Sequence, residues 1–237
     1  ATTEEGTVFK IPLSDTESFG DNSNIYFLSP EEKQARLEGE EVVIEEIKGL
    51  ELNFDLEVTR DAEVEIVVDE VNGSTLKGRG AGYLLIQINT NGKFNMFGDF
   101  TPYSGTYNFR YSGVVQKQFN ILPEGKISWD GNPTEALLDI SAVYNTQANP
   151  SILLENPSIN RKIPVDVIIN LDGELVQPEI TFDFEFPNTS SIVTSELAYR
   201  LDNRATRELQ AFSLVTQGAF FSQSGIDAQS AAYGNLI

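Results

Sequence analysis

The chain has 237 residues, 40% of them hydrophobic and 22% charged, with a formal net charge of -20. This length and apolar content allow one large folded domain or two small ones and exclude a disordered chain, while the negative charge argues against a protein that binds nucleic acid or anionic lipid headgroups. There is no cysteine and no histidine, which excludes disulfides, thiolate metal sites and histidine-based catalysis.

Two absences bear on targeting. No run of about 18 apolar residues exists, so a membrane-spanning helix is not expected. Residues 1–6 are not a signal peptide. We therefore expect the chain to be a fragment whose targeting segment lies elsewhere.

The N-terminal part of the chain predicts small elements separated by polar segments. Residues 7–13 alternate weakly and contain a proline near their end, which is typical of an edge strand, and residues 24–28 predict a second short strand. Ser29, Pro30 and Glu32 have the spacing of a helix start, in which Ser29 caps and Pro30 takes the first turn. A short helix is expected near residues 30–38, ended by Gly39.

Strand signals dominate from residue 40 to residue 111. Large apolar residues alternate with polar, mostly acidic ones along 50–58 and again along 63–69, which is the period of a half-buried strand. Asn72-Gly73 predicts a hairpin turn into a glycine-rich strand over 76–89, and Asn91-Gly92 predicts another turn into 93–100. A further alternating run covers 107–111.

The segment 119–144 is the clearest meander. Its three alternating runs, at 119–121, 127–129 and 136–144, are separated by Pro123-Glu124-Gly125 and by Asp130-Gly131-Asn132-Pro133. Gly, Pro, Asn and Asp supply the backbone angles that tight reversals need. Amphipathic strands joined by short turns are therefore the unit that the rest of the chain repeats.

The C-terminal part changes its period. Residues 145–162 predict a polar loop, and strands follow at 163–171 and 180–186 with a turn at Asp172-Gly173. From Leu197 to Phe212 apolar residues recur every three or four positions, which predicts one amphipathic helix of about five turns ending near Gly218. Residues 222–237 predict a tail that is poorly ordered or depends on a partner. The chain divides into a curled β-sheet domain at 1–187 and a helix with a partner-binding tail at 188–237.

The fold class is all-β, and about a dozen amphipathic strands can hide their apolar faces in three ways. These are a two-sheet sandwich, a closed barrel, or one sheet curled into a trough. A membrane barrel fits poorly, because the strand lengths vary and the apolar faces carry no regular aromatic girdles. Inward phenylalanines would form an ordinary core in a sandwich and an apolar groove in an open sheet. Alternation alone does not distinguish these two arrangements.

Several polar motifs invite a chemical function that their context disfavours. Gly78-Arg79-Gly80-Ala81-Gly82 resembles a phosphate loop but lies between two strands, with no helix N-terminus beside it. Two carboxylates at a fixed separation would suit a glycosidase, and Asp130-Gly131-Asn132 offers few oxygens for calcium. A close-packed strand, a solvated acidic face and a plain turn are the favoured interpretations. We predict no enzyme activity, no cofactor and no metal, with a carbohydrate-active enzyme as the least favoured alternative.

The order of several motifs resembles a known family. Leu-Lys-Gly-Arg-Gly-Ala-Gly-Tyr-Leu begins at Leu76, and the motifs that follow are Gly98-Asp99-Phe100, Gly105-Thr106-Tyr107-Asn108-Phe109, Phe119-x-Ile121, Gly125-x-Ile127-x-Trp129-x-Gly131-x-Pro133 and Leu138-x-Ile140-x-Ala142-x-Tyr144. Together they resemble the C-terminal domain of TamB-type translocation and assembly module proteins, of the AsmA-like group. The segment 197–221 resembles the Bacteroidetes branch. Glu135-Ala136 departs from the many relatives that have a proline there.

The resemblance implies a fold, a place and a partner. The fold is a long antiparallel meander sheet curled into an open trough with an apolar inner surface, a β-taco. The place is the periplasm, with the C-terminal end at the outer membrane and the full-length protein anchored in the inner membrane. The partners are an outer-membrane barrel of the TamA type with POTRA repeats, and phospholipid acyl chains. The activity is non-enzymatic: lipid transport between the membranes, assistance to outer-membrane protein assembly, or both.

Two groups of candidate site residues follow. Inward strand positions are expected to line a groove for acyl chains: Leu52, Phe54, Leu56, Ile66, Val68, Phe119, Ile121, Ile140, Val167, Ile169, Phe182 and Phe184. The C-terminal segment is expected to bind the partner through Arg200, Arg204, Arg207, Phe212, Phe220 and Phe221. The alternative is a closed β-sandwich that acts only as a docking module.

Overall fold

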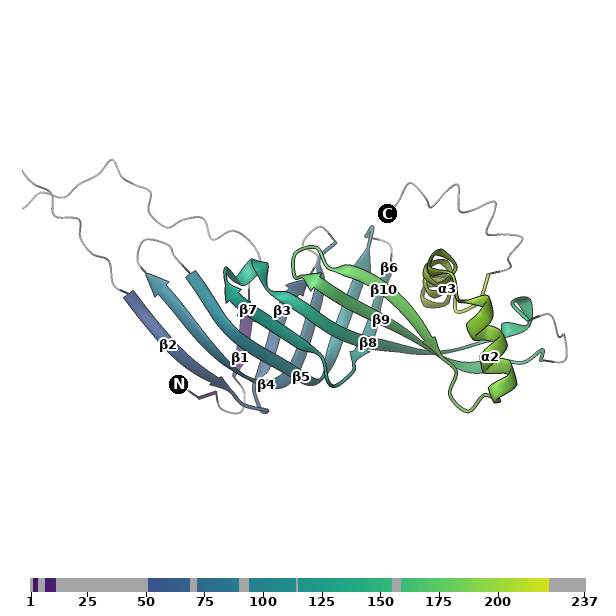
Figure 1. The fold of residues 1–237 in the computed structure, drawn as a ribbon, viewed down its shortest axis with the longest axis horizontal. Helices are drawn as coiled ribbons and strands as arrows, with labels where there is room; N and C mark the ends of the chain where they lie inside the picture. Colours follow the sequence, from purple (N-terminus) through teal and green to yellow (C-terminus); the bar gives the residue numbers. More distant parts are fainter. Residues whose placement is uncertain are drawn as a thin grey trace, which may run out of the picture.

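The computed structural model describes residues 2–3, 7–11, 51–68, 72–89, 94–113, 115–154 and 159–221. Within these residues ten strands form one sheet (Figure 1). The strands are β1 Val8–Ile11, β2 Glu51–Val58, β3 Glu63–Val68, β4 Ser74–Asn89, β5 Phe94–Tyr111, β6 Val115–Ile121, β7 Lys126–Gly131, β8 Leu137–Ala148, β9 Ile163–Glu174 and β10 Glu179–Glu185. The strand predicted at 24–28, the helix near 30–38, the turn at Asn91-Gly92 and the tail 222–237 lie outside the described residues.

The sheet is an antiparallel meander with two long central strands. Its order is β1-β3-β4-β5-β6-β8-β9-β10, with β2 paired to β4 and β7 paired to β5 and β8. All described strand pairs are antiparallel except β1 with β3. Strand β4 pairs with both β2 and β3 along one edge and with β5 along the other. Strand β5 pairs with both β6 and β7 along the edge that faces away from β4. The predicted all-β fold, a long curled sheet, is confirmed.

One face of the sheet is apolar and forms the core. In β9 the inward residues Val165, Val167 and Ile169 are fully buried, while Asp166 and Asn170 point outward and are only partly buried. This is the period of two that the sequence predicted. The inward residues join those of β3 to β6 in one continuous cluster, so the curled sheet packs against its own apolar face.

The glycine-rich run of β4 makes room for an aromatic ring. The β4–β5 register shifts between Arg79 and Gly80, and a Cβ on Gly80 would stand 2.5 Å from the Phe100 ring. Phe100 is buried, so its ring occupies the space that a side chain on Gly80 would need. The run 78–82 is a close-packed strand, which is the favoured interpretation of the sequence.

Two predicted boundaries are wrong because strand pairing continues past them. β8 extends through residues 145–148, which were predicted as loop, because these residues keep their register with β9 and Asn145 Nδ2 donates to Asp166 Oδ1 at 2.7 Å. The predicted turn at Asp172-Gly173 lies inside β9, where Gly173 pairs with Leu138. The chain reverses after Glu174 instead. Short 3-10 turns, η1 Pro133–Glu135 and η2 Pro150–Ile152, flank β8.

The C-terminal segment contains two helices, not the single helix predicted. They are α2 Ser191–Arg200 and α3 Arg204–Gln217. Asn203 separates them, because its side-chain oxygen accepts from Thr206 N at 3.2 Å and so begins a new helix. Gly218 ends α3 in the left-handed conformation, with φ 69°. The helices lie at the end of the sheet away from β2, and α3 contacts β8, β9 and β10 (Figure 1).

Candidate functional site

The apolar face reaches the surface at the end of the sheet formed by β2, β4 and β5 (left in Figure 1). Strand register sorts its side chains into rows that run across the sheet. The first row is Leu52, Ile88 and Phe94, the second is Phe54, Ile86 and Met96, and the third is Leu56, Leu84, Gly98 and Trp129. We call Leu52, Phe54, Ile88 and Phe94 the mouth.

Exposure falls steeply from the mouth to the third row. Phe54 is 43% exposed and Ile88 39%, whereas Met96 is fully buried and Trp129 is 3% exposed. Apolar side chains that are exposed singly are ordinary, but adjacent ones that continue a buried core mark a surface that a ligand or partner covers. The mouth is such a surface, because its residues stand next to one another on three paired strands, β2, β4 and β5.

The twelve residues predicted to line a groove all lie on the apolar face, but few of them are accessible. Leu52 and Phe54 are exposed, and Leu56, Phe182 and Phe184 are partly buried. The other seven are buried inside the core: Ile66, Val68, Phe119, Ile121, Ile140, Val167 and Ile169. The structure therefore brings together an accessible mouth and a packed interior, and not a continuous open channel.

Seven of the ten residues in these rows were missed by the sequence prediction, among them Ile88, Phe94 and Trp129. Ile88 and Phe94 belong to the mouth, and Trp129 belongs to the third row. The signal that could have found the first two was the alternation along the predicted strands 76–89 and 93–100, in which Ile88 and Phe94 stand opposite each other. For Trp129 the sequence offered only strand alternation, which shows that a residue faces inward but not how deeply its side chain is buried.

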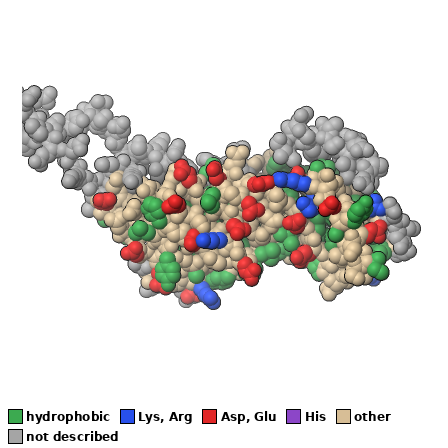
Figure 2. Space-filling model, in the orientation of Figure 1, with side chains coloured by type: hydrophobic (Ala, Val, Ile, Leu, Met, Phe, Trp, Pro, Cys, Tyr) green, Lys and Arg blue, Asp and Glu red, His purple; other side chains and the backbone are tan. Residues whose placement is uncertain are grey.

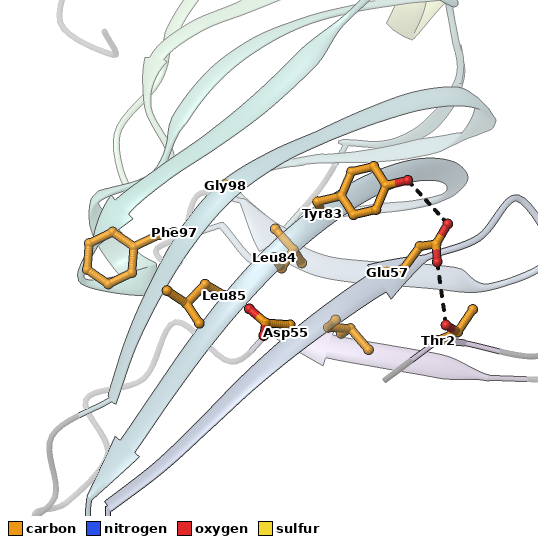
Figure 3. Close-up of a pocket in the computed structure, with 9 residues that line it drawn as sticks. Thr2, Asp55, Glu57, Tyr83, Leu84, Leu85, Phe97 and Gly98 are labelled. Carbon is orange, nitrogen blue, oxygen red and sulfur yellow. Dashed lines mark hydrogen bonds between the residues drawn. The ribbon is translucent and has the colours of Figure 1, made fainter.

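The outer face of the same strands carries a hollow of about 510 Å³. Figure 3 shows Tyr83, Leu85 and Phe97 around it together with Asp55 and Glu57 from β2. Tyr83 Oη donates to one Glu57 carboxylate oxygen at 3.3 Å, and Thr2 Oγ1 donates to the other at 3.5 Å. These bonds tie the edge strand β2 to β4 and to the chain near Thr2, at the end of β2 that lies away from the mouth.

Acidic side chains are spread over the face of the molecule that Figure 2 shows, and strand register places some carboxylates side by side on neighbouring strands. Asp172 stands between Asp139 on β8 and Glu179 on β10. Burial raises its pKa above the ordinary value, and both neighbouring carboxylates raise it further. Asp99 has the opposite surroundings, since hydrogen bonds from Ser128 and then from Lys126 lower its pKa.

The residues predicted to bind a partner are mostly engaged within the domain. Arg204 forms 2.8 Å ion pairs with Glu179 and Glu208, and Arg207 lies 3.7 Å from Asp183. The Phe212 ring packs edge-on against Tyr111, with centroids 5.9 Å apart. Phe220 is buried, and the backbone N–H of Phe221 donates to Gln210 Oε1 at 2.9 Å. Arg200 is partly buried on α2, and a partner role for all six residues stays a prediction.

Other apolar residues at this end face solvent. On α2, Ile192 and Tyr199 are 80% and 78% exposed, and they are seven residues apart on one side of the helix. Neither helix among the described residues is long and apolar enough to cross a membrane. No group of three or more acidic side chains in the described ranges is placed to hold a metal ion.

A single curled sheet with an apolar inner face and an accessible mouth places the protein in the class of β-trough modules. The sequence model of the TamB C-terminal domain matches residues 1–236, and the chain belongs to this family. No curated protein matches the chain. The family is a non-enzymatic module of outer-membrane protein assembly or lipid transport, works with a TamA-type partner, and is located in the periplasm or at the outer membrane. Placement in the Bacteroidetes branch stays a prediction.

Proposed function

We propose that this domain takes part in lipid transport by holding phospholipid acyl chains at its mouth and against the apolar face behind it. The observation that carries the proposal is the contiguous exposure of Leu52, Phe54 and Ile88 on the same face as the core. Each acyl CH₂ that leaves water there contributes roughly 0.8 kcal/mol. Such a surface holds a chain without a fixed polar anchor, which suits a cargo that must move on.

The packed interior limits how the cargo travels. Val167, Ile169 and Phe119 are fully buried by their neighbours, so an acyl chain reaches them only when the two sides of the curled sheet separate. Loading therefore begins at the mouth, and passage along the face requires an opening motion. The full-length protein, anchored in the inner membrane, would deliver lipid to this mouth, and a TamA-type barrel would receive it.

The test places one charge inside the mouth and the same charge outside it. Phe54→Asp puts a carboxylate on the exposed apolar face, while Asn53→Asp puts it on the outer face of the same strand. Binding of a short-chain phospholipid with a fluorescent acyl chain is measured by titration. We expect Phe54→Asp to weaken binding at least about tenfold, since an ion next to an acyl chain loses its hydration, and Asn53→Asp to leave it unchanged.

If both variants bind the lipid as tightly as the wild type does, the mouth is not part of the lipid-binding surface. Circular dichroism must show that both variants fold, which the exposure of Phe54 and Asn53 favours. A charge at Ile169 makes a poorer test, because that side chain is fully buried and an unpaired carboxylate there would unfold the domain.

A docking role at the other end is a second candidate, favoured by the exposed apolar pair on α2. We propose that Ile192 and Tyr199 contact the TamA-type barrel partner, because Phe212 and Phe220 are already packed within the domain. Ile192→Glu with Tyr199→Glu should then abolish capture of the purified barrel protein. Val176→Glu, which changes an exposed apolar residue in the β9–β10 turn, is the control and should not affect capture.

A further inference from the structure

A polar group lies inside the apolar face, in the third row from the mouth. Trp129 is 3% exposed, and its indole Nε1 is buried and has no hydrogen-bond partner among the described residues. The indole N–H is a donor only, and in protein interiors it usually finds an acceptor. A buried donor without a partner is costly, so a position that keeps one raises the question of what it donates to.

The residues in register with Trp129 are apolar or lack a side chain. In register with Trp129 on β5 is Gly98, so no β5 side chain stands between Trp129 and Leu84 in this row. Ile127, the next inward residue of β7, is fully buried, and Met96 in the second row is fully buried as well. None of these side chains offers a hydrogen-bond acceptor of ordinary strength. An acceptor for the indole must therefore come from outside the row.

The apolar mouth restricts which kinds of molecule can carry a hydrogen-bond acceptor to Trp129. The third row lies four residues along β2 from the first, which is about 13 Å at the usual rise of a strand. Water-soluble polar molecules would leave water to pass the apolar mouth, whereas an acyl chain gains by doing so. The polar atom that accompanies an acyl chain in a glycerolipid is the carbonyl oxygen of its ester, which is neutral and accepts one or two hydrogen bonds.

We propose that the Trp129 indole N–H donates to the ester carbonyl oxygen of a bound acyl-ester lipid, and so fixes how deep the lipid sits below the mouth. This inference rests on the proposed function, because it requires that the apolar face binds acyl chains and that the curled sheet opens far enough for a lipid to reach the buried Trp129. It adds a named contact and a chemical preference: lipids with ester-linked chains are held more tightly than lipids with ether-linked alkyl chains, which have no carbonyl group.

The test compares two lipids and two proteins. The full 237-residue chain and its Trp129→Phe variant are titrated with a short-chain diacyl phosphatidylcholine and with its dialkyl ether analogue of equal chain length, both below their micelle concentrations. We expect the wild type to bind the ester lipid about fivefold more tightly, the ratio for a net hydrogen bond of about 1 kcal/mol. Trp129→Phe should bind both lipids with the affinity that the wild type has for the ether analogue.

A second measurement does not depend on a variant that folds. Trp129 is the only tryptophan of the chain, so its fluorescence reports on this position alone. Diacyl lipids that carry bromine close to the ester should quench it more strongly than lipids that carry bromine close to the methyl end. Stronger quenching from the methyl end would overturn the assignment of the ester to Trp129.

The remaining outcomes separate the two proposals. If the wild type binds ester and ether lipids equally, or if Trp129→Phe keeps the ester preference, the hydrogen bond is refuted while acyl-chain binding at the mouth stands. If the wild type binds neither lipid, both this inference and the proposed function fail.

Discussion

At the scale of single residues, a carboxylate on the sheet stabilises or destabilises the folded state according to the charges beside it on the neighbouring strands. Asp172 has a carboxylate on each side in its cross-strand row, and burial together with Asp139 and Glu179 raises its pKa. A raised pKa in the folded state means that the ionised form is disfavoured there. The cost is absent at a pH well below the unfolded-state pKa of about 3.9, grows as the pH rises through the folded-state pKa, and is constant above it.

We therefore expect Asp172→Asn to stabilise the domain at pH 7. Like charges directly opposite on a sheet cost about 0.2–1 kcal/mol, so a gain of about 0.5 kcal/mol is expected, or about 1–2 °C in melting temperature for a chain of this size. The gain should disappear at about pH 3, where the side chain is neutral in both states. Thermal unfolding followed by circular dichroism at both pH values measures it.

Asp99→Asn is the matched comparison with the opposite sign. Ser128 and Lys126 lower the Asp99 pKa, and its carboxylate lies 3.0 Å from Lys126 Nζ. Its stabilising effect is present above the unfolded-state pKa and is lost as the pH falls through the folded-state pKa, so Asp99→Asn should destabilise at pH 7. A decrease in melting temperature for Asp172→Asn, or an increase for Asp99→Asn, would contradict this account.

At the scale of elements, the helix boundary after α2 depends on a single cap. Asn203 accepts a hydrogen bond from Thr206 N at 3.2 Å, whereas Ser190 precedes α2 without a side-chain capping bond. Replacing a bonded cap by alanine costs about 1 kcal/mol. We expect Asn203→Ala to lower the free energy of unfolding by about that amount and Ser190→Ala to change it by much less, both measured by urea denaturation. Equal effects of the two changes would mean that the boundary is set by packing.

This boundary also shows where sequence reasoning stops. The apolar period from Leu197 to Phe212 is that of a helix, and nothing in it marks the break, because Leu201 keeps the spacing of the period and is buried as Leu197 is. The side chain of Asn203 can cap a helix. Within a continuous helical pattern, however, such a residue is recognised as a cap only once the chain is known to change direction there. The tertiary contacts of α3 with β10 decide that change.

The strands were easier to predict than the site. Alternation located β2, β3, β6, β9 and β10 within a few residues, because a sheet with one buried face enforces a period of two. It also identified which residues face inward. It could not tell the exposed Phe54 from the buried Phe119, because depth depends on which strands face one another after the sheet curls. The mouth can therefore be recognised only in the folded sheet, where strand register brings its residues together.

At the scale of the whole molecule, the imbalance of charge opposes the compact fold. The chain has 36 acidic residues against 16 basic ones. The ion pairs of the described strands and helices, such as Lys77 with Glu63 and Lys126 with Asp99, have exposed or partly exposed side chains, so water screens them and each contributes little to stability. Repulsion among the excess carboxylates acts over longer distances than these pairs and should therefore outweigh them. The same negative charge repels anionic headgroups, which is consistent with the proposal that lipid binds at the apolar mouth.

Salt should consequently stabilise this domain at neutral pH. Raising NaCl from about 0.01 M to 0.15 M shortens the Debye length from about 30 Å to about 8 Å, which screens repulsion between distant carboxylates more than attraction within a close pair. We expect the melting temperature at pH 7 to rise by about 2–5 °C, which corresponds to about 1–2 kcal/mol. The control is the same titration near the isoelectric point of 4.2, where the net charge vanishes and the rise should vanish with it. A melting temperature that falls with NaCl at pH 7 would show that close ion pairs dominate the electrostatics of the fold.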